Sequence, residues 1–203
     1  MSWRKRNKKG KAYRGDRFTK QAKEEGYAAR SVFKLKEIDQ RFKLLRKGQR
    51  VVDLGCYPGS WSRYAWERIG AKGVLVGVDL EETQGIPARF ITRSVMDVTP
   101  EELLEWLDGP CDVLLSDMAP RTTGDRFGDH VRQIELADRA LELASQVVRP
   151  GGSFVVKLFE GPEINAFHAR VKEHFRRLKR TKPEASQRSQ LELFLVAQDK
   201  REG

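Results

Sequence analysis

The chain has 203 residues, which suits one α/β domain with a complete core rather than two such domains. Its 39 Lys and Arg residues outnumber its 29 Asp and Glu residues, and the first 50 residues alone hold 18 of the basic residues and 5 of the acidic ones. No apolar run approaches the ~20 residues of a membrane span, and the N-terminus is too polar for a signal sequence. The composition therefore argues against a membrane protein and predicts a cytoplasmic protein with a polyanionic partner.

The basic N-terminus predicts a flexible arm over residues 1–17, ahead of one domain over residues 18–203. Such an arm binds polyanions by releasing counterions, and Trp3, Tyr13 and Phe18 could stack on bases. A solvated tail is the alternative interpretation. The two cysteines have no C-x-x-C spacing and the three histidines are scattered, so we expect neither a disulfide nor a metal site.

Hydrophobic periodicity and turn residues predict alternating helices and strands along the rest of the chain. In chain order we expect a helix over 31–45, a strand over 51–54, a helix over 60–69 capped by Ser60, strands over 74–79 and 89–95, a helix opening at 99–102, a strand over 111–117, a helix over 129–148, a strand over 153–159, a helix over 162–175, and two strands around Pro183, the last over 191–197. Crossover helices predict parallel strands, and two final strands without a helix between them predict an antiparallel pair. The sequence therefore predicts an α/β fold with a mostly parallel seven-stranded sheet and an antiparallel C-terminal strand.

A glycine-rich turn follows the first predicted strand. Gly55 and Gly59 allow positive φ or close backbone approach, and the next helix points unpaired N–H groups at a ligand above the strand end. The glycines stand as G-x-x-x-G, whereas a dinucleotide site needs G-x-G-x-x-G. Asp79 ends the next apolar run, where its carboxylate can accept both hydroxyls of a ribose. A nucleoside without a pyrophosphate fits best, S-adenosylmethionine being the common one, and an ordinary structural turn is the alternative.

Four charged residues lie at unusual places in apolar segments. Asp117 ends the fourth predicted strand, and Lys157 lies near the end of the fifth. Because a buried lysine is costly without a partner, these two residues either form a structural ion pair or act on a substrate, and the sequence leaves both possibilities open. Lys34 interrupts an apolar helix face and by itself indicates a snorkelling surface residue, and Glu192 lies between two leucines in the last strand.

Five groups of residues stand in a specific order between about residues 18 and 198. They are Ala29-Arg30-Ser31-Val32-Phe33-Lys34-Leu35, Val52-Asp53-Leu54-Gly55 with Pro58-Gly59 and Trp61, Ser116-Asp117-Met118-Ala119-Pro120, Gly151-Gly152-Ser153-Phe154-Val155-Val156-Lys157, and Lys182-Pro183 leading to Glu192. In this order they resemble the FtsJ/RrmJ-type ribosomal RNA 2′-O-methyltransferases, the RlmE group that modifies a uridine of the large-subunit ribosomal RNA.

The resemblance implies a Rossmann-like class I methyltransferase fold with S-adenosylmethionine as the cofactor and no metal. It places the catalytic set of the family on Lys34, Asp117, Lys157 and Glu192. It places the cofactor contacts on Gly59, Trp61, Asp79, Asp97 and Asp117, with Asp97 at the adenine end. The chain departs from the usual family residues at Cys56, Tyr57, Ser60, Gln187, Gln190 and Phe194.

We therefore expect a monomeric enzyme that transfers a methyl group from S-adenosylmethionine to a ribose 2′-hydroxyl, most simply a uridine of 23S rRNA in the large ribosomal subunit. Lys157 would either accept the hydroxyl proton or orient the hydroxyl as a cation, and Glu192 would orient one of the lysines. The arm and the basic residues between Arg170 and Lys182 would hold phosphates. The alternatives are a transfer RNA or RNA cap as substrate, a non-catalytic RNA-binding protein on the same fold, and a nicotinamide-dependent enzyme, which the missing G-x-G-x-x-G opposes.

Overall fold

The computed structural model describes residues 14–120, 124–186 and 192–202. Its strands are β1 (Arg50–Leu54), β2 (Val74–Asp79), β3 (Arg89–Thr92), β4 (Cys111–Ser116), β5 (Val148–Phe159), β6 (Phe175–Thr181) and β7 (Glu192–Lys200). Its helices are α1 (Arg14–Glu24), α2 (Val32–Phe42), α3 (Ser60–Ile69), α4 (Pro100–Leu107), α5 (Arg126–Val147) and α6 (Ile164–His174), with a 3-10 turn, η1, over Val95–Asp97.

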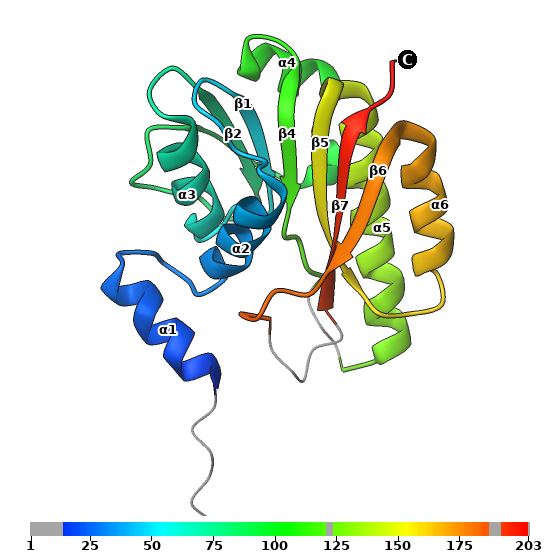
Figure 1. Cartoon of the computed structure of the whole chain (residues 1–203), viewed down its shortest axis with the longest axis horizontal. Coiled ribbons are helices and arrows are strands. Elements are labelled where there is room, and N and C mark those ends of the chain that lie inside the picture. Colours follow the sequence, from blue (N-terminus) through cyan, green and yellow to red (C-terminus); the bar gives the residue numbers. More distant parts are fainter. Residues whose placement is uncertain (1–13, 121–123, 187–191, 203) are drawn as a thin grey trace, which may run out of the picture.

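The strands form one seven-stranded sheet in the order β3-β2-β1-β4-β5-β7-β6 (Figure 1). Strands β1 to β5 pair in parallel, whereas β7 pairs antiparallel with both β5 and β6. The predicted α/β fold, with its mostly parallel sheet and antiparallel C-terminal strand, is confirmed. The strand order reverses between β1 and β4, and a ligand site is expected beyond the carboxyl ends of strands at such a point.

Helices cover both faces of the sheet, because successive strand residues point to opposite sides. Val51 of β1 belongs to a buried cluster with α2 and α3, whereas Val52 belongs to a cluster with α4, α5 and α6. The same alternation continues in β7, where Phe194 and Val196 join the first cluster and Leu195 joins the second. We call these two sides the α2 face and the α5 face.

Several boundaries differ from the sequence expectation. Helix α1 begins at Arg14, inside the predicted arm, and Phe18 packs on Phe33 with ring centroids 5.5 Å apart. Residues 1–13, which make up the rest of the arm and include Trp3 and Tyr13, lie outside the described residues. Strand β3 ends at Thr92 rather than at residue 95, because Ser94 caps the η1 turn by accepting a hydrogen bond from the Met96 amide.

The start of α3 is also a correction. Its N-cap is Gly59, which has φ of 98°, and not Ser60. Ser60 Oγ accepts a hydrogen bond from the Ala29 amide instead, at 2.7 Å. The hydroxyl therefore ties the segment before α2 to the glycine-rich turn. The predicted cap at Thr99 is confirmed, because its Oγ1 accepts from the Glu102 amide at 3.2 Å.

A buried carboxylate fixes the position of α2. Asp39 is 2% exposed, and its Oδ1 accepts a hydrogen bond from the Leu45 amide at 2.8 Å. Its Oδ2 accepts from the Tyr64 hydroxyl at 2.8 Å and from Arg68 Nε at 3.1 Å, both on α3. Burial raises the pKa of the Tyr64 hydroxyl, and its hydrogen bond to Asp39 adds to the rise. Asp39 thus joins the C-terminal end of α2 to α3.

We expect Asp39→Ala to lower the free energy of unfolding by about 2–4 kcal/mol, because it leaves several buried donors unpaired. Asp39→Asn keeps an acceptor of the same size and should cost less. Urea denaturation of the three proteins measures the difference. A loss below about 0.5 kcal/mol for Asp39→Ala, the range of neutral surface substitutions, would show that α2 does not depend on this carboxylate.

Candidate active site

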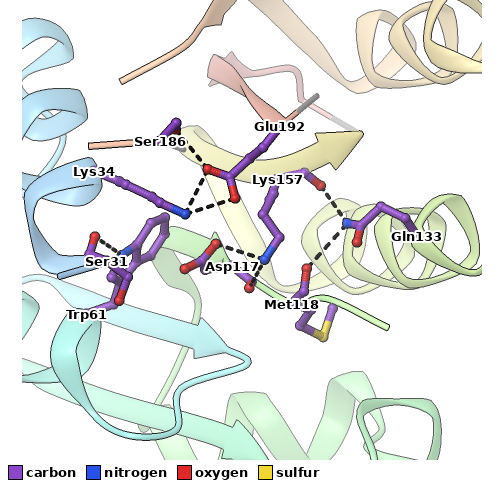
Figure 2. A network of polar contacts seen from close by, with 9 residues as sticks. All are labelled: Ser31, Lys34, Trp61, Asp117, Met118, Gln133, Lys157, Ser186 and Glu192. Carbon is purple, nitrogen blue, oxygen red and sulfur yellow. Dashed lines mark hydrogen bonds and ion pairs between the residues drawn. The ribbon is translucent and has the colours of Figure 1, made fainter. Parts of the chain in front are cut away.

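Two buried lysine–carboxylate pairs lie side by side on the α2 face, near the carboxyl ends of β4 and β5 (Figure 2). In the first pair, Lys34 Nζ lies 2.7 Å from Glu192 Oε1 and donates to Oε2 at 2.9 Å. The two side chains are 8% and 4% exposed. Glu192 therefore orients Lys34, a choice that the sequence left open, and Lys34 is buried rather than a snorkelling surface residue.

In the second pair, Lys157 Nζ lies 3.0 Å from Asp117 Oδ1 and donates a hydrogen bond to the backbone carbonyl of Asp117 at 2.5 Å. The Lys157 side chain is 7% exposed and that of Asp117 is 14% exposed. The contact at Oδ1 is an ion pair without hydrogen-bond alignment, so among the described residues this buried oxygen keeps its acceptor capacity. Asp117 thus holds Lys157 through this oxygen, and the residue also lines the cavity described below.

Sheet register explains why residues so distant in sequence meet. Asp117 directly follows β4, and Lys157 lies two residues before the end of β5. Lys157 pairs with Phe194, and Phe159 pairs with Glu192, so Glu192 stands beside the carboxyl end of β5. Helix α2 packs over this corner through Val32, Leu35 and Ile38, which brings Lys34 of its first turn above the Phe194 ring, 5.7 Å from its centroid.

Both pairs are held by buried polar residues that the sequence analysis missed. Gln133 of α5 is 1% exposed, and its Nε2 donates to the carbonyls of Lys157 at 2.9 Å and of Met118 at 3.3 Å. Ser186 donates from its hydroxyl to Glu192 Oε1 at 2.8 Å. Gln133 thus joins the end of β4 to the end of β5 (Figure 2). A polar residue on the buried side of an amphipathic helix was the signal that could have indicated it.

A cavity of about 320 Å³ opens beside Asp117. Its lining brings together the ends of β1, β2 and β4 and the start of η1, and comprises Gly55, Tyr57, Val78, Asp79, Leu80, Arg93, Ser94, Val95, Asp117, Met118, Ala119 and Leu136. Asp79 accepts hydrogen bonds from the amides of Tyr57 at 2.9 Å and Glu81 at 3.2 Å. The Asp79 carboxylate therefore stands at the junction of the glycine-rich turn and β2, as the sequence predicted.

A third carboxyl group lies beneath the glycine-rich turn. Asp53 is fully buried in β1, and its Oδ2 accepts from the Ser62 hydroxyl at 2.6 Å. Burial raises the pKa of Asp53 to about 7, the hydrogen bond from Ser62 opposes the rise, and the charges of Asp117 and Asp79 add to it. Three carboxyl groups thus surround the same strand ends, and this environment favours a cationic ligand.

The other predicted cofactor residues do not line this cavity. Gly59 lines a neighbouring hollow beside Pro58 and Arg63, and a Cβ at Gly59 would lie 2.9 Å from Thr83. Trp61 is buried, and its indole N–H donates to the Ser31 carbonyl at 2.8 Å. Asp97 is exposed at the end of η1. The role of these three residues as cofactor contacts stays a prediction.

The unusual residues of the chain fall at different distances from the cavity. Tyr57 is 53% exposed and lines it, while the Cys56 thiol is buried and 3.6 Å from Thr83 Oγ1. Phe194 lies beneath Lys34 and packs on Trp61 with ring centroids 5.7 Å apart. Gln187 and Gln190 lie outside the described residues.

No group of three or more possible metal ligands occurs among residues 14–120, 124–186 and 192–202. Within the same ranges, no helix is long and apolar enough to cross a membrane. The two cysteines are free and buried.

Comparison with known proteins assigns this architecture to a family. The chain matches the FtsJ-like methyltransferase family over residues 27–200. It is 42% identical to ribosomal RNA large subunit methyltransferase E of Desulfatibacillum aliphaticivorans, over 98% of this chain and 97% of that protein. It is 46% identical to the protein of the same name from Syntrophobacter fumaroxidans, over 89% of this chain and 93% of that protein.

A solved structure agrees with these relatives. The crystal structure described as a ribosomal RNA methyltransferase of Plasmodium falciparum superimposes with a TM-score of 0.76 and 30% sequence identity, over 86% of this chain and 98% of that one. The family match covers the glycine-rich turn, the cavity and both buried ion pairs. The chain therefore belongs to the FtsJ-like methyltransferase family.

Proposed function

We propose that this protein transfers a methyl group from S-adenosylmethionine to the 2′-hydroxyl of a ribose, in a uridine of the large-subunit ribosomal RNA. The observation that carries the proposal is the meeting of a buried Lys157–Asp117 pair with a carboxylate-rich cavity. The names of the relatives from Desulfatibacillum aliphaticivorans and Syntrophobacter fumaroxidans support ribosomal RNA as the substrate.

The residues of the cavity fit S-adenosylmethionine. Asp79 would accept the ribose hydroxyls, and Asp117 lines the same cavity. The cofactor carries positive charge, which the carboxyl groups of Asp53, Asp79 and Asp117 would stabilise. Gly55 closes the floor of the cavity, where a Cβ would lie 2.8 Å from Met118. A side chain there would push the turn away from β4.

S-adenosylmethionine, when bound, supplies a methyl group that is already activated on a sulfonium. The protein therefore has to align the 2′-hydroxyl and manage its proton. Lys157 is the candidate for both tasks, because its ammonium group is held beside the cavity by Asp117 and is shielded from water. The Lys34–Glu192 pair lies next to the Lys157–Asp117 pair, and Lys34 would hold the substrate ribose or its phosphate there.

Gln133 would act as a positioning residue for this chemistry. Gln133 does not line the cavity. It would act through its hydrogen bonds to the backbone carbonyls of Lys157 and Met118. Because both carbonyls depend on the same amide group, β4 and β5 cannot shift relative to each other without breaking a buried hydrogen bond. A displacement of about 1 Å at a reacting group can cost about 10²-fold in rate.

The proposed function is tested by supplying labelled S-adenosylmethionine with large ribosomal subunits, free ribosomal RNA and transfer RNA, and then mapping the modified ribose. We expect transfer to large-subunit ribosomal RNA. Lys157→Ala should lower the single-turnover rate by about 10²-fold or more, with cofactor and RNA binding near the wild-type level.

The matched control is Lys72→Ala, which removes an exposed lysine before β2, at the opposite end of the sheet. It should leave the rate unchanged. Transfer only to transfer RNA, or a Lys157→Ala rate within a few-fold of wild type, would contradict the proposed substrate or the proposed role of Lys157, respectively.

For Gln133→Met, which keeps the size of the side chain and removes both donors, we expect kcat to fall by about 10-fold or more while the Kd for S-adenosylmethionine changes less than about threefold. Gln146→Met on the same helix is the control, because Gln146 is exposed and its side chain donates to the Glu142 carbonyl of its own helix. A lower free energy of unfolding with an unchanged kcat would assign Gln133 a purely structural role.

A further inference from the structure

The basic residues of the edge strand β6 divide between the two faces of the sheet. Directly paired residues of an antiparallel ladder point to the same face. Arg177 and Lys179 pair with Gln198 and Val196, and Val196 belongs to the α2-face cluster. Arg177 and Lys179 therefore project to the α2 face. Arg180 projects to the α5 face, because its ladder partner Leu195 belongs to the other cluster, against which Leu178 also packs.

The two faces differ in how these charges are satisfied. Arg176 lies 3.4 Å from Asp199, and on the α5 face Arg180 donates to Asn165 of α6 at 2.9 Å. On the α2 face, Arg177 and Lys179 are exposed, and neither has an ion pair within the described part of the chain. Unpaired, exposed cations are the groups that can exchange their counterions for phosphates.

The exposed pair continues the face on which the catalytic candidates lie. Lys157, Phe194 and Thr181 form one row across β5, β7 and β6, so Thr181 is two strand spacings, about 10 Å, from Lys157. Lys179 and Arg177 follow Thr181 down the edge strand. They are about 7 Å apart, because two strand residues span that distance. This separation is close to that of successive phosphates along an RNA strand.

Helix α2 adds to the same surface. Arg41 reaches across to Thr181, whose hydroxyl accepts from Arg41 Nη1 at 3.1 Å. Lys43 follows α2 and is exposed, next to Phe42, whose carbonyl accepts from Gln198 at 3.1 Å. Gln198 is in turn the ladder partner of Arg177. Four cations thus border the seam between the end of α2 and the edge strand.

We propose that this seam, formed by Arg41, Lys43, Arg177 and Lys179, binds the phosphates of the RNA strand that flanks the methylated nucleotide. The proposal rests on the proposed function, since it takes the strand to start at the Lys157 corner. Of the basic residues between Arg170 and Lys182 that the sequence analysis expected to hold phosphates, the proposal keeps only Arg177 and Lys179, which lie on the α2 face. Arg170 is excluded because two of its guanidinium nitrogens, Nε and Nη2, donate to the Asp138 carboxylate.

The test compares two double variants that remove the same charge from the same strand. For Arg177→Ala with Lys179→Ala, we expect the Kd for large-subunit ribosomal RNA to rise by about 10-fold, and the slope of log K against log salt to become shallower by about 1.4, because two single-strand phosphate contacts at about 0.7 each are lost. The control, Arg176→Ala with Arg180→Ala, should change the Kd less than about twofold.

Both double variants should retain the wild-type melting temperature and S-adenosylmethionine affinity, because all four residues are exposed. The charge-preserving exchange of Arg177→Lys with Lys179→Arg should bind RNA like wild type. Two outcomes would overturn the proposal that the seam binds RNA. One is an equal loss of RNA affinity in the two double variants, and the other is no loss of RNA affinity in either while the wild-type protein methylates RNA. Absence of methyl transfer by the wild-type protein would instead overturn the proposed function on which the seam rests.

Discussion

The ammonium group of Lys157 loses its hydration when β5 is buried beneath α2, and Asp117 is the carboxylate that compensates for the loss. Lys157 lies on β5 and Asp117 directly follows β4, so the pair forms only when β4 and β5 are in register. Gln133 of α5 holds that register, because its side-chain amide donates to the carbonyls of both Lys157 and Met118. A buried pair of this kind contributes little net stability compared with apolar residues of equal size, which leaves its placement at the strand ends to be explained by function.

Charge changes in sign from the cavity at the strand ends to the edge strand of the sheet. Asp79 and Asp117 line the cavity and Asp53 is buried in β1 nearby, so a cationic cofactor would be stabilised there. The two ion pairs follow, and beyond them the edge strand carries cations such as Lys179 that have no ion pair among the described residues, so a polyanion would be stabilised there. A cofactor and an RNA strand of opposite charge would thus meet at the Lys157 corner, which is where methyl transfer requires them to meet.

The sequence predicted the sheet well, because apolar runs and crossover helices define parallel strands without knowledge of contacts. It also predicted that Asp79 and Asp117 stand at strand ends and that Lys157 lies near the end of its strand. It could not predict that Lys34 pairs with Glu192, because this contact depends on how α2 packs over β7. Helix α1 was also missed by the sequence analysis, because few apolar residues mark it and its packing depends on a contact between Phe18 and Phe33 of α2. The division of the β6 cations between two faces likewise depends on the register with β7.

The most direct test of this account replaces the Lys157–Asp117 pair by apolar residues of similar size, Lys157→Met with Asp117→Leu. Urea denaturation and single-turnover methyl transfer at saturating S-adenosylmethionine are then measured on the same protein. If the pair is retained for chemistry, the free energy of unfolding should stay equal or rise by about 1–4 kcal/mol, while transfer should fall by about 10²-fold or more. A protein destabilised by several kcal/mol whose folded fraction transfers methyl groups at the wild-type rate would contradict the account.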